Sequence, residues 1–302
     1  MGYVIGVDIG GTNTRALAVD AAGKAVGERI RLESHKDSVE AFVKQVCRVI
    51  EEAIPEGLGK PLAVGVGLPG PVNAPSGILF EAPHLPGFRD VPLGKLIGDK
   101  LQLPVFIEND ANCAAFGEEA FGAARGKKDF LMLTFGTGIG GAIFVDGKIQ
   151  HGKRGAAGEV GHMNLHPNGI VCNCGRRGCF ERYVSAVTVL NRAKAEHPEI
   201  EQSHEIFEAA DRGERWAKDL LDDVSSDLAR GLGNLVNIFD PEAIVLGGGL
   251  FVQKFENFLA QTREKLQREA FASSLKGFEL LTSQVPGNAG LLGAAAMAYR
   301  RL

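Results

Sequence analysis

Short apolar runs rich in β-branched residues recur along the chain, and most of them end in a group of glycines. Runs of this length are typical of buried strands, and glycines at their ends are typical of turns where the backbone approaches a ligand closely. We therefore predict strands at residues 3–9, 15–20, 61–68, 104–108, 129–136, 141–147 and 242–248.

Longer segments repeat their apolar residues at the spacing of one helix face. They predict helices at residues 38–54, 111–122, 216–239, 254–271 and 289–301. Strands mostly precede helices in the first half of the chain, and helices dominate the second half. This order predicts an α/β protein with a helix-rich second domain. The long helix at 216–239 is expected to pack in a core rather than to form an interface.

The composition is that of an ordinary globular protein. The 302 residues are 45% apolar and 23% charged, which is enough chain for two domains with separate cores. The formal net charge of −4 offers no basic face for nucleic acid or for an anionic membrane. The start MGYVIGVDIGGT lacks the features of a signal peptide, and no apolar run reaches the ~18–20 residues of a membrane span. With five cysteines, three of them clustered, we expect a cytoplasmic protein with one metal site.

Residues 3–26 and 130–149 share one plan: an apolar strand, a turn of glycine and threonine, a second apolar strand and a turn with aspartate. Each segment predicts a β-hairpin whose tip exposes backbone N–H groups and a threonine hydroxyl. Two such tips would suit phosphate groups. The alternative is a pair of structural hairpins with glycine turns. No Walker loop of the form G-x-x-x-x-G-K-[ST] is present.

Two aspartates stand at the ends of predicted strands. Asp8 lies beside the first glycine turn, where a hydrated magnesium ion on ATP would be a partner for its carboxylate; the alternative is an aspartate that caps its own turn. Asp110 precedes an alanine-rich helix, and in isolation this position favours a helix N-cap. In a chain with two phosphate tips Asp110 is also a candidate base, because phosphoryl transfer to a hydroxyl needs a carboxylate that accepts its proton.

A cluster with the spacing H-x9-C-x-C-x4-C offers one imidazole and three thiolates, from His162, Cys172, Cys174 and Cys179. This ligand set predicts a tetrahedral zinc ion, and four protein ligands indicate a structural rather than a catalytic ion. His166 is a rival for the histidine ligand. Cys47 and Cys113 are expected to pack inside helices.

Seven motifs follow one another in a recognisable order: DIGGT, LPGP, ENDAN, GTGIGG, GEVGH, CNCGRRGC and VLGGG. Across essentially the whole chain, this order resembles the ROK family, which contains bacterial sugar kinases and related repressors. The resemblance implies a two-domain, actin-like (ribonuclease H-like) α/β fold with a cleft between the domains. The first domain would span 1–112, completed by the C-terminal helix 288–302. The second would span 113–287 and carry the zinc site.

The resemblance also implies roles for individual residues. It places the base at Asp110 and the zinc-ligating histidine at His162, whose second ring nitrogen would face the sugar. Sugar contacts are implied at Gly70, Asn109, Asp110, Glu159, His162 and Glu181. Contacts with ATP and its Mg²⁺ are implied at Asp8, Gly10, Gly11, Thr12, Asn13, Thr137, Gly138, Gly248 and Gly249, the last two beside adenosine.

The activity implied is transfer of phosphate from ATP to the 6-hydroxyl of a hexose, with glucose favoured. N-acetylglucosamine, N-acetylmannosamine, fructose and mannose remain open as substrates, and so does a homodimer. Two other functional classes are considered. A sugar-responsive repressor would need a helix-turn-helix domain, for which the segment before Asp8 leaves no room. A sugar-binding module without activity would not need two phosphate loops.

Three positions depart from the family's common form. Asn13 replaces the usual lysine, and Arg15 is a candidate source of the missing charge. His84 and Phe88 stand where the family commonly has asparagine and tryptophan. They leave the specificity for sugar or nucleotide open; the alternative is that both are surface-loop residues.

Overall fold

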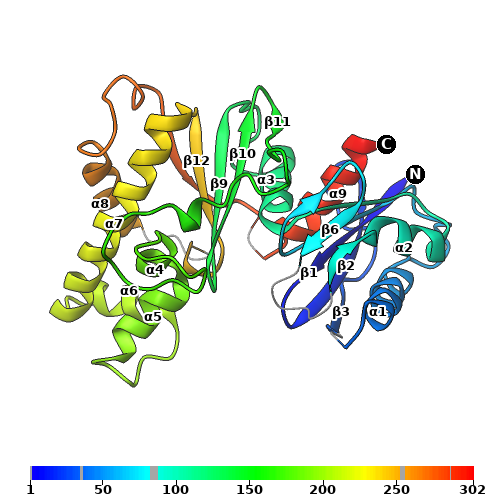
Figure 1. The fold of residues 1–302 in the computed structure, drawn as a ribbon, viewed down its shortest axis with the longest axis horizontal. Helices are drawn as coiled ribbons and strands as arrows, with labels where there is room; N and C mark the ends of the chain where they lie inside the picture. The colour runs from blue at the N-terminus through cyan, green and yellow to red at the C-terminus, as the bar shows by residue number, and fades with distance from the viewer. Residues whose placement is uncertain (1, 35–36, 82–87, 252–255, 286) are drawn as a thin grey trace. The chain divides into compact units, whose positions relative to one another are not determined.

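The structure is a computed structural model that describes residues 2–34, 37–81, 88–251, 256–285 and 287–302. The chain forms two compact units. The first contains Met1–Gly126, Ile149–Ala157 and Gly287–Leu302, and the second contains Lys127–Lys148 and Gly158–Pro286. Each unit has a five-stranded sheet with helices packed on it (Figure 1).

The first sheet has the strand order β3-β2-β1-β4-β8. β1 pairs antiparallel with β2 and parallel with β4, which in turn pairs parallel with β8. The strands are β1 (Tyr3–Ile9), β2 (Asn13–Asp20), β3 (Ile30–Glu33), β4 (Val64–Leu68) and β8 (Val105–Asn109). A separate three-stranded sheet consists of β5 (Val72–Asn73), β6 (Ile78–Glu81) and β7 (Arg89–Val91).

Helices cover both faces of the first sheet. α1 (Val39–Glu52) and α2 (Leu93–Leu101) pack on one face, and α3 (Asp110–Phe121) and α9 (Ala289–Arg301) on the other. Successive residues of β1 point to opposite faces of the sheet, as the geometry of a β-strand requires. Ile5 and Val7 join the core under α1, whereas Gly6 faces α9, where an added Cβ would lie 2.1 Å from the Leu291 carbonyl oxygen. The glycine therefore lets the backbone of α9 lie directly on the strand.

The second sheet has the strand order β11-β10-β9-β12-β13. Its strands are β9 (Phe130–Phe135), β10 (Ile139–Val145), β11 (Lys148–Ile149), β12 (Ala243–Gly247) and β13 (Glu279–Thr282). The helices of this unit are α4 (Glu181–Val184), α5 (Ala186–Lys194), α6 (Ser203–Asp211), α7 (Arg215–Phe239) and α8 (Glu256–Leu266). Apolar residues of α5 to α8 form one core with Leu131, Leu133, Ile244 and Leu246 of the sheet, which confirms α7 as a core helix.

The seven predicted strands and five predicted helices are confirmed, with shifts at their ends. The largest shift is in α8, which ends at Leu266 rather than at 271. Asn237 of α7 explains this difference, because its side chain accepts a hydrogen bond from Phe271 N (2.9 Å) and donates one to Glu269 O (3.0 Å). These bonds hold residues 269–271 outside a helix.

The first unit extends beyond the 112 residues expected for it. α3 continues to Phe121 and packs closely on α9, where a Cβ on Gly293 would lie 1.6 Å from the Cys113 carbonyl oxygen. Because the helix is one rigid body, all of it stays with the first unit. Within the described part of the chain, every helix is too short or too polar to span a bilayer.

Candidate functional site

The first glycine turn joins β1 to β2 and projects its tip into solvent. Gly11 and Thr12 are exposed, and the turn is closed by a hydrogen bond from Gly10 N to Asn13 O (2.8 Å). Asn13 Oδ1 accepts a hydrogen bond from Arg31 Nε (3.0 Å). Arg31 could not be predicted from the sequence; it brings a guanidinium next to Asn13, the position where the family commonly has lysine.

Asp8 lies at the base of the same turn. Its carboxylate is 4.0 Å from Arg15 Nη1, and an added Cβ on Gly290, at the start of α9, would lie 3.0 Å from its Cγ. Burial raises the pKa of Asp8, the Arg15 charge lowers it and the Asp110 charge raises it, so that the pKa lies above its ordinary value. Arg15 only partly compensates the negative charge of Asp8, so the Asp8 carboxylate suits a hydrated cation as a further partner.

The strand β8 runs directly into α3 at Asn109 and Asp110. Asn109 is the N-cap, since its Oδ1 accepts hydrogen bonds from Ala111 N (2.9 Å) and Asn112 N (3.2 Å). Its Nδ2 donates to Gly70 O (3.2 Å), so two of the implied sugar contacts lie side by side. The helix-cap interpretation of Asp110 is therefore wrong, because its neighbour has that role.

Asp110 occupies the first position of α3 and is exposed. One oxygen accepts a hydrogen bond from Ala111 N (2.9 Å). The protein packed around the side chain desolvates the carboxyl and raises its pKa, and the hydrogen bonds from Ala111 N and Asn109 offset this only in part. The result is an accessible carboxylate of increased basicity.

The second glycine turn joins β9 to β10. Thr137 is exposed at its tip, and Gly136 N donates to Gly138 O (2.9 Å). Glu181 lies against this turn: its Oε2 accepts a hydrogen bond from Ile139 N (3.1 Å), and a Cβ on Gly138 would come within 2.2 Å of that oxygen. Gly138 therefore makes room for a carboxylate.

The loop after β12 lies beside this second turn. Gly248 has a φ of +88°, and an added Cβ would lie 2.4 Å from the Phe135 carbonyl oxygen. β9 and β12 are parallel, so the turn at Gly136 and the loop at Gly248 and Gly249 lie at the same edge of the sheet. Ligands of α/β sheets bind at this carboxyl edge.

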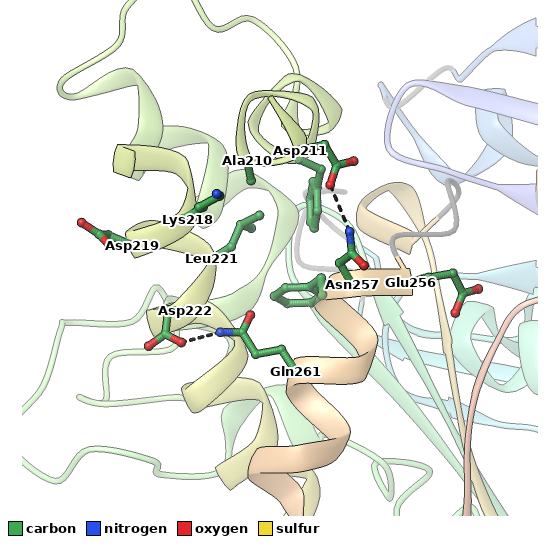
Figure 2. Close-up of a pocket in the computed structure, with 11 residues that line it drawn as sticks. Ala210, Asp211, Lys218, Asp219, Leu221, Asp222, Glu256, Asn257 and Gln261 are labelled. Atoms are coloured by element: carbon green, nitrogen blue, oxygen red, sulfur yellow. Dashed lines mark hydrogen bonds between the residues drawn. The ribbon is translucent and has the colours of Figure 1, made fainter. Parts of the chain in front are cut away.

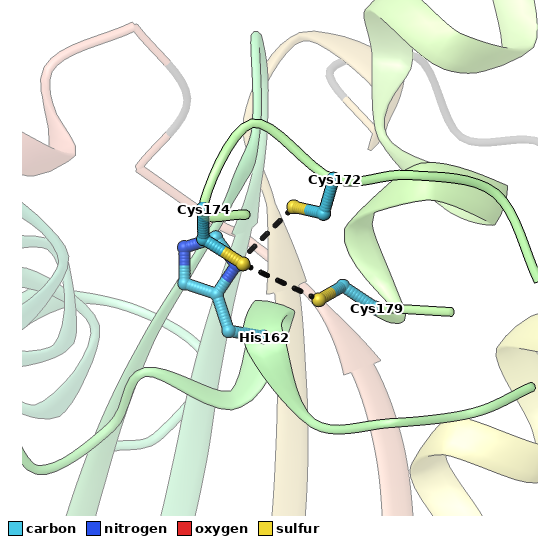
Figure 3. Close-up of side chains that lie close together, drawn as sticks. All are labelled: His162, Cys172, Cys174 and Cys179. Atoms are coloured by element: carbon cyan, nitrogen blue, oxygen red, sulfur yellow. Dashed lines mark hydrogen bonds between the residues drawn. The ribbon is translucent and has the colours of Figure 1, made fainter. Parts of the chain in front are cut away.

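The four predicted zinc ligands converge (Figure 3). Their ligand atoms all lie within 4.8 Å of one another, with Cys172 Sγ 3.7 Å from His162 Nδ1 and Cys174 Sγ 3.6 Å from Cys179 Sγ. A zinc tetrahedron with bonds of ~2.3 Å to sulfur has edges of about 3.8 Å, so these residues fit the ion. Burial and the neighbouring thiols raise the pKa of Cys179, so a bound cation would be needed for three thiolates to coexist.

His162 presents Nδ1 to the sulfurs, and Nε2 lies on the opposite side of the ring (Figure 3). The rival ligand His166 is outside the cluster, and its Nε2 bonds to Asp227 Oδ1 on α7 (2.8 Å). Glu159 is exposed immediately before the short 3-10 helix Val160–His162, and its carbonyl accepts a hydrogen bond from His162 N (3.1 Å). Glu181 approaches Cys172 Sγ (3.8 Å) as well as the second glycine turn.

A pocket of about 600 Å³ opens between α6, α7 and α8, and sequence analysis did not predict it (Figure 2). Its walls include the rings of Phe207 and Phe258, which meet edge to face with centroids 5.4 Å apart. Asn257 Nδ2 donates to Asp211 Oδ1 (3.3 Å), as Figure 2 shows. Among the described residues, the lining consists of Phe207, Ala210, Asp211, Lys218, Asp219, Leu221, Asp222, Glu256, Asn257, Phe258 and Gln261.

The remaining residues singled out in the sequence are buried in the core or lie outside the described residues. Phe88 is 2% exposed and packs edge to face on Phe42, with centroids 5.2 Å apart, so it is a core residue. Cys47 and Cys113 are buried in α1 and α3, as predicted. His84 falls outside the described residues.

Comparisons with known proteins agree with this geometry. A family model described as the ROK family matches residues 4–301. The chain is 33% identical to a glucokinase of Thermotoga maritima, over 99% of this chain and 98% of that protein. A ROK hexokinase from Thermus thermophilus superposes with a TM-score of 0.84 at 33% identity, covering 99% of this chain and 98% of that one. A ROK family glucokinase from Streptomyces griseus, solved with glucose and AMPPNP, gives 0.83 at 32% identity and covers 99% and 100%.

The chain is also similar to a protein of another class. It is 28% identical to the xylose repressor of Bacillus subtilis, over 98% of this chain and 77% of that protein. The same fold is therefore found in kinases and in a repressor.

Proposed function

This chain belongs to the ROK family, and on that premise we propose that it is an ATP-dependent sugar kinase that phosphorylates the 6-hydroxyl of glucose. The observation that carries the proposal is Asp110. Asp110 is an exposed residue at a strand–helix corner whose N-cap is a different residue, so its carboxylate is available to a substrate.

Asp110 would act as the general base. Its carboxylate would orient the 6-hydroxyl and accept its proton as the oxygen attacks the terminal phosphorus of ATP, while the bond from that phosphorus to the bridging oxygen breaks and ADP leaves. A raised pKa makes it a stronger base than an ordinary aspartate. Asn109 and the backbone at Gly70, which are hydrogen-bonded to each other, would bind further sugar hydroxyls.

The glycine turns would bind the phosphates through their free amides and the hydroxyls of Thr12 and Thr137. Asp8 would hold the hydrated Mg²⁺ of the nucleotide, and this ion would neutralise charge on the phosphoryl oxygens. Arg15 and Arg31 stand close to the first turn and would add positive charge in place of the family's lysine.

The second unit would contribute to sugar recognition through the metal loop, the segment 162–179 that carries the four predicted zinc ligands. With Nδ1 turned to the zinc ligands, His162 keeps Nε2 for a hydrogen bond to a hydroxyl, and a bound zinc would fix its ring angle and tautomer. Glu159 and Glu181 would accept hydrogen bonds from neighbouring hydroxyls, because one carboxylate can accept two.

We infer that the pocket between α6, α7 and α8 holds the nucleoside end of ATP. α8 is the next α-helix after β12 and the loop at Gly248. The first turns of α8 therefore lie toward the carboxyl edge of the sheet, where the second glycine turn also lies. Aromatic walls and the amides of Asn257 and Gln261 suit a flat, polar base, whereas the four carboxylates of the lining do not suit phosphates.

A substrate panel tests the function. Purified protein with Mg²⁺ and ATP should release ADP with glucose at the highest kcat/KM, and ³¹P NMR of the product should show a 6-phosphate. Mannose, fructose, N-acetylglucosamine and N-acetylmannosamine complete the panel, and a sample without sugar measures ATP hydrolysis. A higher kcat/KM with an acetylated sugar than with glucose would show that the acetylated sugar is the preferred substrate. ADP release with none of the sugars would contradict the kinase.

Titration calorimetry separates the kinase from a sugar-binding module. A kinase should bind AMPPNP with measurable heat in the presence of glucose, because both turns and the pocket would be occupied. A module that binds only sugar should give heat with glucose and none with the nucleotide.

A further inference from the structure

The carboxylate of Glu108 is fully buried at the end of β8, next to Asn109. A buried charge is unfavourable unless donors surround it, and here four donors do so. Oε1 accepts hydrogen bonds from Asn112 Nδ2 (2.9 Å) and Asn109 N (3.0 Å). Oε2 accepts hydrogen bonds from His151 Nε2 (2.7 Å) and Arg301 Nη2 (2.9 Å).

These donors come from three separate parts of the first unit. Asn109 is the N-cap of α3 and Asn112 lies in its first turn, Arg301 is the last residue of α9, and His151 lies in the segment 149–157. Arg301 also donates to Ile107 O (3.3 Å), one residue before Glu108 in the same strand. Glu108 is therefore the point at which α3, α9 and the segment 149–157 are joined.

The segment 149–157 is held on the first unit by a second contact. Gly155 has a φ of +66°, and an added Cβ would lie 2.0 Å from the Val72 carbonyl oxygen. The backbone of the segment thus lies directly on that of β5. The chain continues from Ala157 into Glu159 and His162, so the docked segment leads straight into two of the implied sugar contacts.

The surroundings of Glu108 stabilise its ionised form. Burial alone would raise the pKa of Glu108, but hydrogen bonds from His151, Asn112 and Asn109 N, together with the His151 charge, hold it below its ordinary value. Glu108 is therefore ionised and Arg301 is its counter-ion. A second fully buried glutamate, Glu118, lies at the other end of α3, where its Oε2 accepts a hydrogen bond from Ala123 N (2.7 Å).

We propose that Glu108, His151 and Arg301 form a positioning cluster that fixes the corner Asn109–Asp110 for phosphoryl transfer, an inference that rests on the proposed function. The Asp110 carboxylate accepts a hydrogen bond from Ala111 N (2.9 Å) at the start of α3, so its position depends on where the first turn of this helix begins. Glu108 holds that turn through Asn109 N and Asn112. A displacement of about 1 Å at a reacting group reduces the rate by about 100-fold.

The test compares variants of the cluster with a matched control in the same helix. Glu108→Gln and His151→Ala should lower kcat by about 10- to 100-fold while the KM for hexose and for ATP changes by less than about threefold, because the cluster touches neither ligand. His151→Gln keeps an N–H donor at similar reach and should recover most of the loss. Glu118→Gln removes a buried charge from the same helix and should lower the melting temperature with kcat retained.

Three outcomes would overturn the proposal: wild-type kcat in both Glu108→Gln and His151→Ala, an equal fall of kcat in Glu118→Gln, or a change confined to KM. If Glu108→Gln does not fold, His151→Ala decides, since the histidine side chain is 25% exposed and less central to the core.

Amide hydrogen exchange keeps this inference separate from the proposed function. His151→Ala should speed exchange in a peptide that covers residues 109–113, and Glu118→Gln should leave that peptide unchanged. If the wild-type protein phosphorylates no sugar, the proposed function fails, but this measurement still decides on the cluster. Equal exchange in wild type and His151→Ala would contradict it.

Discussion

The carboxylate of Asp110 is subject to two opposing effects. At the first position of α3 the helix dipole and the free amides favour a negative charge, which by itself lowers the pKa of an aspartate. Desolvation by the surrounding protein is the larger effect and raises the pKa. Because the native state then holds its proton more tightly than the unfolded chain, the charge of Asp110 reduces stability at neutral pH, and stability is regained as the pH falls through the raised pKa.

This shift predicts the pH dependence of activity. A base works only when deprotonated, so kcat/KM should fall on the acid side with an apparent pKa above the ~3.9 of an ordinary aspartate. The measurement is a kcat/KM profile at saturating ATP, with melting temperatures recorded at each pH to exclude unfolding. A profile that stays flat down to about pH 4 would contradict this account of the base.

The candidate residues could be predicted from the sequence, but not all of their partners could. Asn109 and Asp110 are equally good N-caps by residue type, so only the backbone geometry could assign the cap to Asn109. His162 and His166 are similarly close to the cysteines in sequence, and the partner of His166 is Asp227, on a distant helix. The sequence predicts Glu108 only as the end of a strand, although a charge at the end of a buried strand indicates that a partner such as Arg301 must exist.

At the scale of elements, Glu181 connects two parts of the second unit. The same carboxylate lies near Cys172 in the metal loop and accepts a hydrogen bond from Ile139 N in the second glycine turn. Because α4 begins at Glu181, two residues after the last cysteine, the ligands also determine where this helix starts. The metal loop is therefore expected to support both the sugar contacts and the phosphate turn.

Metal removal should reveal this connection. We expect one zinc ion per chain by elemental analysis, and Cys174→Ser should lose it. Without the ion, the KM for hexose and for ATP should both rise by about 10- to 100-fold, since His162 and Glu181 lose their fixed positions. Cys47→Ser, in α1 and outside the cluster, is the control. Full zinc content in Cys174→Ser, or unchanged KM values after the loss of zinc, would contradict the assignment.

The long strands and helices were predictable because their apolar patterns are regular, and the short elements were not. β5 and β7 have two and three residues, too few to show any period. The end of α8 depended on the side chain of Asn237 in another helix, which no local pattern contains.

At the scale of the whole molecule, the C-terminal helix completes the first unit. Close contacts through glycine hold α9 in place: a Cβ on Gly65 would lie 1.9 Å from the Ala294 carbonyl oxygen, and one on Gly293 would lie 1.6 Å from the Cys113 carbonyl oxygen. Both neighbours are backbone atoms, which cannot rotate away. The sequence resemblance implied that this helix returns to the first unit, but the glycines that allow the contact could be identified only in three dimensions.

Gly293→Ala should therefore destabilise the protein although alanine is the better helix former. We expect a loss of about 3 kcal/mol, the upper end for overpacking, measured by urea unfolding. Gly11→Ala is the control, because nothing lies within 4 Å of an added Cβ at that position. An unchanged unfolding free energy in Gly293→Ala would contradict the packing of α9 on α3.

The central claim is that Asp110 is the base of a sugar kinase, and Asp110→Asn tests it most directly. The variant keeps the shape and removes the proton acceptor, so kcat should fall by about 10²- to 10⁴-fold. The dissociation constant for glucose should change little. The melting temperature should stay equal or rise, because the substitution removes a desolvated charge. Asp99→Asn, on the exposed surface of α2, is the control and should behave as wild type. A folded Asp110→Asn protein with near wild-type kcat would contradict the account.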